Sequence, residues 1–165
     1  MGLAATIKAA IAYKLSGSPD LGSVRSEYGG HANTELQNGT GDFQATKVFS
    51  DTRQLAASAT EDLDLSGTLA SPLGGTVVFT AIKAILIKAA PGNTNNVIVG
   101  GAAANGFIGP FGAANNTIAV RPGGSFLLTA PKTGWPVTAD TADLLKLANS
   151  AGGSVVDFDV VIVGI

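Results

Sequence analysis

The stretch TVVFTAIKAILIKAAPGNTNNVIVGG, residues 76–101, decides the fold of this 165-residue chain. Its first part is the longest apolar run of the sequence, interrupted only by Lys83 and Lys88. A helix over this run would end at Pro91-Gly92, where proline and glycine stop a helix. The apolar face of that helix would consist of Val78, Ile82, Ile85 and Ala89.

Strands are the favoured interpretation of the same run, because many of its side chains are β-branched and suit a pleated surface. The turn-forming residues 91–96 follow, and Val97, Ile98 and Val99 form a second β-branched run. Two such runs around a turn-rich loop are typical of a hairpin with a slightly long connection. The stretch therefore predicts a β-hairpin at the centre of a β core.

The composition is poor in charge. Hydrophobic residues make up 45% and charged residues 13%, against a usual charged share of roughly 25%. Much of the surface must therefore be uncharged, which is common where neighbouring subunits cover it; a monomer rich in Ser, Thr and Asn is the alternative. The net charge of −2 and the pI near 5.2 argue against nucleic acid or an acidic membrane as a partner.

Residue counts exclude several other classes of protein. The chain has no cysteine, which excludes disulfides, zinc-thiolate sites and thiol catalysis. Its 22 glycines and 7 prolines argue against a helical bundle and favour short strands joined by turns. The N-terminus has no signal-peptide pattern, and no apolar run reaches the roughly 18 residues of a membrane span. We therefore expect no membrane partner.

From Ala45 onward, short strand candidates alternate with turn signals at roughly the 8–12-residue spacing of a sandwich or barrel. In the last strand Val156, Phe158, Val160 and Ile162 share one face, and Asp157 and Asp159 share the other. These patterns predict an all-β chain with a single jelly-roll-like β-sandwich over residues 46–165.

The N-terminal part, residues 1–45, is predicted to be a strand followed by an extended interaction arm. Residues 3–15 fit both helical and strand spacing, and we favour a strand. Residues 16–42 are interrupted by Ser-Gly-Ser-Pro, Tyr-Gly-Gly-His and Asn-Gly-Thr-Gly-Asp. So many turn signals predict that no long element forms there.

The sequence contains few residues that could carry catalysis. His31 is the only histidine and lies in the arm, where nothing would orient it as a base, and no Gly-x-Ser-x-Gly motif occurs. Asp157 and Asp159 could share a hard cation in a small metal-dependent hydrolase, or they could form the solvent face of the strand, which we favour. We therefore predict no catalytic, cofactor-binding or metal-binding residues.

Partner contacts are predicted instead at aromatic and polar residues outside the core strands. Trp135, between Gly134 and Pro136, suits an anchor for a protein or a sugar, with packing at the edge of the core as the alternative. The predicted contacts are Tyr13, Tyr28, His31, Phe107, Phe111 and Trp135.

Several segments carry a family resemblance. They are Asn38-Gly39-Thr40-Gly41, residues 51–67, Ile82-Lys83-Ala84, residues 92–102, residues 120–124 and Asp143-Leu144-Leu145-Lys146. Over residues 38–165 the chain resembles virion proteins of tailed bacteriophages, whereas residues 1–37 depart from them. The resemblance implies a structural protein of the phage particle, similar to β-sandwich capsid decoration (cement) proteins or to short head and tail fibre modules, without catalytic residues.

The expected function is then that of a decoration protein on the capsid exterior, assembled in the host bacterial cytoplasm. Its expected partners are the major capsid protein and itself, as a homo-oligomer such as a trimer. The alternative is a receptor-binding or glycan-binding head or tail fibre module. In that case Trp135, Tyr28 and the loops near Phe107 and Phe111 would make the contacts.

Overall fold

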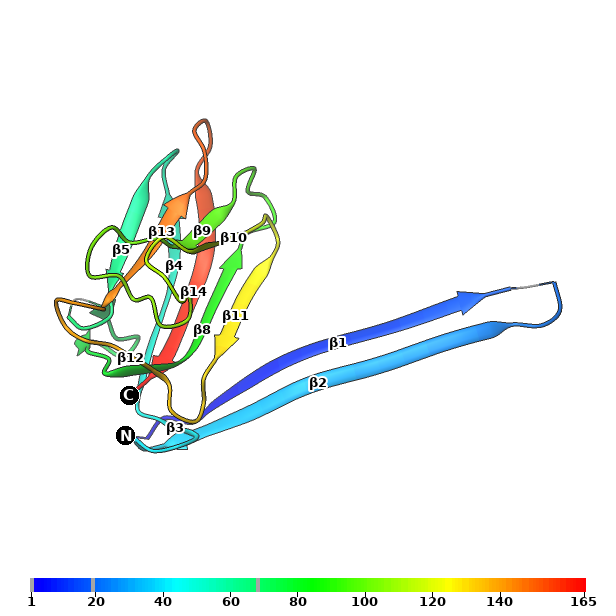
Figure 1. Cartoon of the computed structure of the whole chain (residues 1–165), viewed down its shortest axis with the longest axis horizontal. Helices are drawn as coiled ribbons and strands as arrows, with labels where there is room; N and C mark the ends of the chain where they lie inside the picture. The colour runs from blue at the N-terminus through cyan, green and yellow to red at the C-terminus, as the bar shows by residue number, and fades with distance from the viewer. Residues whose placement is uncertain (1, 19, 68) are drawn as a thin grey trace.

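The computed structural model describes residues 2–18, 20–67 and 69–165, and these residues form an all-β chain with a long protruding hairpin (Figure 1). The strands are β1 (Ala5–Gly17), β2 (Val24–Asn38), β3 (Gln44–Ala45), β4 (Lys47–Leu55), β5 (Thr60–Asp64), β6 (Leu69–Ala70), β7 (Thr76–Val77), β8 (Ala81–Ala89), β9 (Val97–Gly100), β10 (Thr117–Val120), β11 (Ser125–Thr129), β12 (Trp135–Pro136), β13 (Leu144–Asn149) and β14 (Val156–Gly164). Among the described residues no helix is long and apolar enough to cross a membrane.

Two antiparallel sheets form the sandwich, and β6 and β7 add a small two-stranded sheet to the globular part. One has the strand order β11-β8-β14-β4, with β12 also paired to β8, and the other has the order β10-β9-β13-β5. Buried side chains from both sheets form one hydrophobic cluster between them. The all-β prediction and the β-sandwich prediction are confirmed.

Strand β14 follows the predicted alternation. Val156, Phe158, Val160 and Ile162 are buried in the core, while Asp159 is exposed on the other face. A side-chain period of two places every second residue on the same face, so one strand supplies both a core surface and an outer surface. The outer surface of this sheet is the one that meets the arm.

The strand interpretation of residues 76–101 is confirmed, since β8 and β9 occupy the two apolar runs. The predicted hairpin between them is wrong, because β8 and β9 belong to different sheets. Asn93 in the connecting loop accepts a hydrogen bond from the backbone N–H of Asp157 and donates one to its carbonyl, each at 2.9 Å. The loop is thereby held to β14 and crosses to the second layer instead of turning back.

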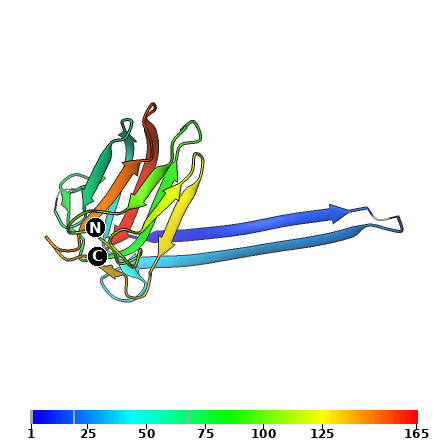
Figure 2. The ribbon, with the colours of Figure 1, turned by 45° about the horizontal axis from the view of Figure 1, so that its top comes forward.

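Strands β1 and β2, of 13 and 15 residues, form an antiparallel hairpin that extends away from the sandwich (Figures 1 and 2). The strand prediction for residues 3–15 is confirmed. The prediction that residues 16–42 hold no long element is wrong, because β2 pairs residue by residue with β1 from Ala5–Leu36 to Gly17–Val24. Backbone pairing with a long partner strand outweighs the weak strand preference of the glycines within β2.

Candidate interaction site

The arm, formed by β1 and β2, has two chemically different faces. Residues paired across an antiparallel ribbon point to the same side. Ile11 pairs with Gly30, Tyr13 with Tyr28, and Leu15 with Ser26. The face that contains these pairs continues to Val24, and we call Ile11, Tyr13, Leu15, Val24 and Tyr28 the distal apolar face.

This distal apolar face is open to solvent. The exposed fraction is 74% for Ile11, 68% for Leu15 and 60% for Tyr28. Isolated apolar residues on a surface are ordinary, but a contiguous apolar face on an extended ribbon marks an interaction site. A two-stranded ribbon alone is also only marginally stable in water. The distal arm is therefore the main candidate for contact with another molecule.

The opposite face of the arm is charged and polar. Lys8 pairs with Asn33, Lys14 with Glu27, and Ala10 with His31. Arg25 forms an exposed ion pair with Glu27 on the same strand. Exposed ion pairs contribute little stability, roughly 0–1 kcal/mol, so this face suits contact with water or with a polar surface.

Two tyrosines stack against each other in the middle of the arm. The ring centroids of Tyr13 and Tyr28 are 6.1 Å apart and the ring planes are inclined by 30°. Across the ribbon, the Tyr13 hydroxyl lies 3.5 Å from Ser26 Oγ. The Tyr28 ring covers Gly30, because a Cβ atom on that glycine would lie 2.5 Å from the tyrosine hydroxyl. The glycine thus lets the aromatic pair lie flat on the ribbon.

The base of the arm is held by a second apolar cluster, separate from the sandwich core. Leu36, Ala45, Ala84 and Val163 are its buried members, and Leu36 is only 1% exposed. Leu3, Ala5 and Ile7 of the arm pack against this cluster. Ala5 and Ile7 belong to the same face as Ile11 and Leu15, so the buried base and the exposed distal face are one continuous surface.

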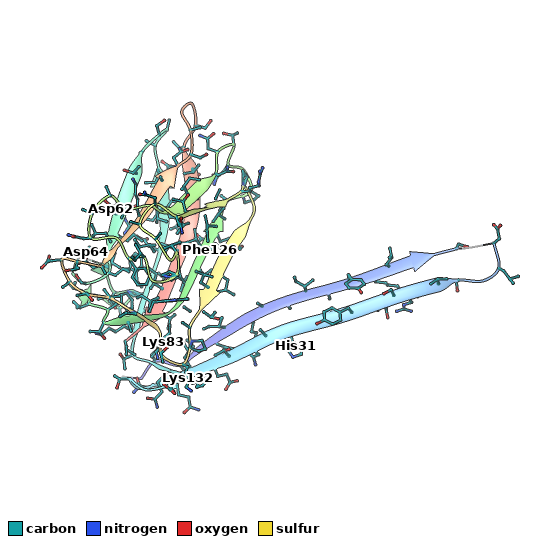
Figure 3. All side chains as sticks on the ribbon, viewed as in Figure 1. His31, Asp62, Asp64, Lys83, Phe126 and Lys132 are labelled. Carbon is teal, nitrogen blue, oxygen red and sulfur yellow. The ribbon has the colours of Figure 1, made fainter. Side chains whose placement is uncertain are left out.

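Lys83 fastens the loops around the base. Its side chain is buried, and Nζ donates hydrogen bonds to the carbonyl oxygens of Lys132, at 2.6 Å, and Gly41, at 3.2 Å. The register of β8 against β14 shifts beside this lysine, since Val163 pairs with Ala84 and the next residue pairs with Ile82. The bulge accommodates the lysine between two inward-facing isoleucines. Figure 3 shows Lys83 and Lys132 where the arm leaves the sandwich.

A groove of about 560 Å³ lies between the first residues of the arm and the outer face of the β11-β8-β14-β4 sheet. Its sheet side is lined by Val48, Ala84, Leu86, Leu127, Val161 and Val163, and its arm side by residues 3–8. The sheet side is entirely aliphatic, and beyond it the same face turns polar at Lys88 and Asp159, which are paired across β8 and β14. The groove and the distal apolar face are thus two open apolar surfaces of the described residues near the arm.

The six predicted contact residues fall into two groups. Tyr13 and Tyr28 lie on the distal apolar face, and His31 is exposed on the charged face. Phe107 is 2% exposed, so its side chain offers no surface to a partner in this structure. Phe111 and Trp135 are half-buried and pack against the sandwich core. The partner contacts predicted for the three arm residues remain predictions. The three aromatic residues of the loops pack in or against the sandwich core.

The acidic pair Asp157 and Asp159 lies on the outer face of the sheet. Gln54 donates a hydrogen bond to Asp157 and Thr52 donates one to Asp159, each at 2.8 Å. Across the described residues, no group of three or more His, Asp or Glu side chains is arranged to hold a metal ion. Figure 3 places His31 on the arm, far from Asp62 and Asp64 on the sandwich.

Within the part of the chain that the structure describes, Asp143 is the one buried carboxylate, and it organises a turn. Its Oδ2 accepts hydrogen bonds from Ser66 Oγ and from the backbone N–H of Asp140, each at 2.8 Å. The Ser66 hydroxyl also lies 3.1 Å from Asp64. These contacts give the Asp143 carboxylate a structural role in the turn.

Sequence reasoning missed the residues that define the groove and most of the distal apolar face. Ile11 and Leu15 were visible as members of an alternating strand, which was a usable signal. Leu86 and Leu127 gave no signal, because half-buried leucines on the outside of a sandwich look like core leucines in the sequence. Comparison with protein-family models and with curated proteins gives no match for this chain. Function must therefore be inferred from these two surfaces.

Proposed function

We propose that this chain is a structural protein of a tailed-bacteriophage particle and acts as a capsid decoration protein. The sandwich would lie on the outside of the shell, and the arm would reach a neighbouring molecule. One observation carries the proposal: the arm projects from the sandwich and exposes an apolar face along its distal half. An arm of this kind serves attachment to something outside its own domain.

The dimensions of the arm support this role. At about 3.3 Å per residue, a strand of the length of β1 spans roughly 43 Å, which is enough to cross from one subunit to the next in an assembly. The sandwich has a hydrophobic core of its own, and the base of the arm packs against a separate cluster. The arm therefore adds reach, and the charge-poor composition suits a chain that is covered by neighbours.

We further infer that the sandwich has jelly-roll connectivity. Of its eight main strands, β4, β8, β11 and β14 form one sheet and β5, β9, β10 and β13 form the other. Each step along these eight strands changes sheets, except the step from β9 to β10. Such repeated crossing between two four-stranded sheets is typical of jelly rolls, which occur in viral capsid domains.

The proposed mechanism is mass action. A protein that binds the assembled shell but not its dissociated subunits stabilises the shell in proportion to RT ln(1 + [L]/Kd). Buried apolar area across the seams between capsid subunits supplies the affinity, and a stable contact needs roughly 1,200–2,000 Å² of total buried surface. Stabilisation of the shell then requires no catalytic chemistry.

The test uses phage particles that lack this protein, to which the purified full-length chain is added back. We expect saturable binding at a fixed copy number per shell and a higher temperature of particle disruption. Imaging of particles that carry the labelled chain is expected to show it on the head. Absence of shell binding, or unchanged heat resistance at saturation, would overturn the proposal. Binding to host cells or to a glycan array without shell binding would favour the fibre-module alternative.

A further inference from the structure

The floor of the groove is a defined aliphatic patch. Across the sheet, Ala84 pairs with Val163 and Val163 with Val48, and the next row joins Leu127, Leu86 and Val161. Leu86, Leu127 and Val161 are only half-buried, although their side chains are apolar. Two rows of aliphatic side chains thus lie open on the outer face, directly beside the base of the arm.

The same chain already shows what kind of surface this patch binds. Ala5 and Ile7, at the proximal end of the arm, pack against the cluster that contains Ala84 and Val163. Ile11 and Leu15 belong to the same face of the same strand. The distal apolar face therefore repeats the chemistry and the geometry of a contact that the structure already contains.

The distal part of the arm cannot reach the groove of its own chain. Leu15 lies eight residues beyond Ile7, which is a distance of about 26 Å along an extended strand. The arm projects away from the sandwich in both ribbon views (Figures 1 and 2). Any arm that fills the rest of the groove must come from another copy of the chain.

A free strand edge borders the groove. The consecutive residues 3–8 line it, so the wall is an edge of β1 and not one of its faces. Among the described strands, β1 pairs with β2 alone. Its outer edge therefore presents unpaired N–H and C=O groups, which commonly recruit a further strand. A second arm in the groove would pair with the free N–H and C=O groups of this edge and would also cover the aliphatic floor.

Charge does not oppose the approach of two arms. Residues 1–38 carry three basic and three acidic side chains, which cancel; they are Lys8, Lys14, Arg25, Asp20, Glu27 and Glu35. Most of these charges lie on the face opposite the distal apolar face. Two copies of the arm can lie close together without net repulsion.

We propose that the distal arm of a second copy of this chain occupies the groove, with its apolar face on the outer side of the β11-β8-β14-β4 sheet. Each sandwich receives the distal arm of another copy while the base of its own arm stays packed in place. The arrangement is reciprocal in a dimer and cyclic in a larger ring. The inference deepens the self-association included in the proposed function. Its test measures self-association of the purified chain without capsids. Self-association can therefore fail while binding to the shell is observed, and binding to the shell can fail while self-association is observed.

The first experiment measures the mass of the full-length chain by sedimentation over a range of concentrations. The variant Ile11→Glu/Leu15→Glu places charge on the distal apolar face. The matched variant Ala12→Glu/Ser16→Glu places the same charge one residue further along, on the opposite face. We expect the first variant to raise the dissociation constant of the oligomer about a hundredfold or more, and the second to leave it near the wild-type value.

The second experiment changes the groove. Leu127→Glu puts a charge on its floor, and Ser125→Glu puts one on the same strand and face outside the groove. Circular dichroism and thermal unfolding establish that both variants fold. If Leu127→Glu does not fold, Leu127→Ser replaces it. We expect dissociation with the groove variant and an unchanged oligomer with the control.

Cross-linking tests the contact directly, since the chain has no native cysteine. A tagged Leu127→Cys chain is mixed with a Leu15→Cys chain or a Ser16→Cys chain and treated with a short bismaleimide. We expect tagged heterodimers mainly with Leu15→Cys. The proposal is overturned by a wild-type chain that stays monomeric, by equal effects of the two arm faces, or by an oligomer that depends on the arm but not on the groove.

Discussion

The ammonium group of Lys83 donates a 2.6 Å hydrogen bond to the carbonyl oxygen of Lys132, and the same group reaches Gly41 O at 3.2 Å. One buried side chain thus ties two loops to a bulge of β8 at the place where the arm leaves the sandwich. A buried ammonium is costly unless its donors are satisfied, so these two carbonyl oxygens keep the lysine in place and the lysine keeps the loops in place.

Replacement of Lys83 by Met is expected to lower the free energy of unfolding by about 1–3 kcal/mol, because two carbonyl groups lose a charged donor. Amide hydrogen exchange should rise in residues 38–44 and 131–134. The control Lys88→Met changes an exposed lysine of the same strand and should stay within about 0.5 kcal/mol of wild type. Equal effects of the two variants would contradict the role of Lys83 as a tether.

Replacement of Leu36 by Ala is expected to loosen the arm without unfolding the sandwich. Leu36 is fully buried in the cluster at the arm base, and its truncation should cost the local structure about 2–5 kcal/mol. Hydrogen exchange should then accelerate through β1 and β2 while the sandwich strands stay protected.

The matched change for this prediction is Leu63→Ala, in the sandwich core. It should lower the melting temperature of the whole domain, because it creates a cavity among side chains of both sheets. If Leu36→Ala lowers the protection of sandwich and arm equally, the two clusters form one cooperative unit and the prediction is wrong.

Asn149 joins the loops at the end of the sandwich opposite the arm. Its Nδ2 donates to the carbonyl oxygens of Ala56, at 3.0 Å, and Ser154, at 2.7 Å, and its Oδ1 accepts from Asn95 at 3.0 Å. Asn149→Ala should cost about 1–3 kcal/mol, since buried carbonyl groups lose their donor. Asn149→Asp should cost more, because a carboxylate would face those carbonyl oxygens.

The difference between these two Asn149 variants should shrink as the pH falls from 7 toward about 4, where an aspartate side chain gains a proton. Urea unfolding at several pH values measures it. The exposed substitution Asn33→Asp serves as the control and should show no comparable pH dependence. A difference that stays constant with pH would show that charge is not the cause.

Asp143 is expected to stabilise its turn through Oδ2 alone. Asp143→Ala should cost about 1.5–3 kcal/mol for each of the hydrogen bonds from Ser66 and Asp140. Asp143→Asn keeps an acceptor in place and should recover part of that loss. The control Asp140→Asn retains the backbone donor and the positive φ of 59°, which asparagine tolerates, so chemical denaturation should find it near wild type.

The arm shows where sequence reasoning succeeds and where it fails. The alternation of Ile7, Ala9, Ile11, Tyr13 and Leu15 favoured a strand over the helix that the four-residue spacing of Ile7, Ile11 and Leu15 also allowed. β2 was missed because its glycines and polar residues have weak local preference. The length of β2 is decided by its pairing with β1, and no sequence pattern within residues 16–42 reveals that pairing.

The stretch at residues 76–101 divides in the same way. Its β-branched runs determined two buried strands, and the alternation in residues 156–162 determined a core face and an outer face, because side-chain stiffness and a period of two are local properties. Only the tertiary structure decided that β8 and β9 belong to different sheets, that Lys83 lies buried in a bulge, and that aliphatic side chains form an open groove beside the arm. Those features depend on which distant backbone each strand pairs with, and pairing is settled by the packing of the whole chain.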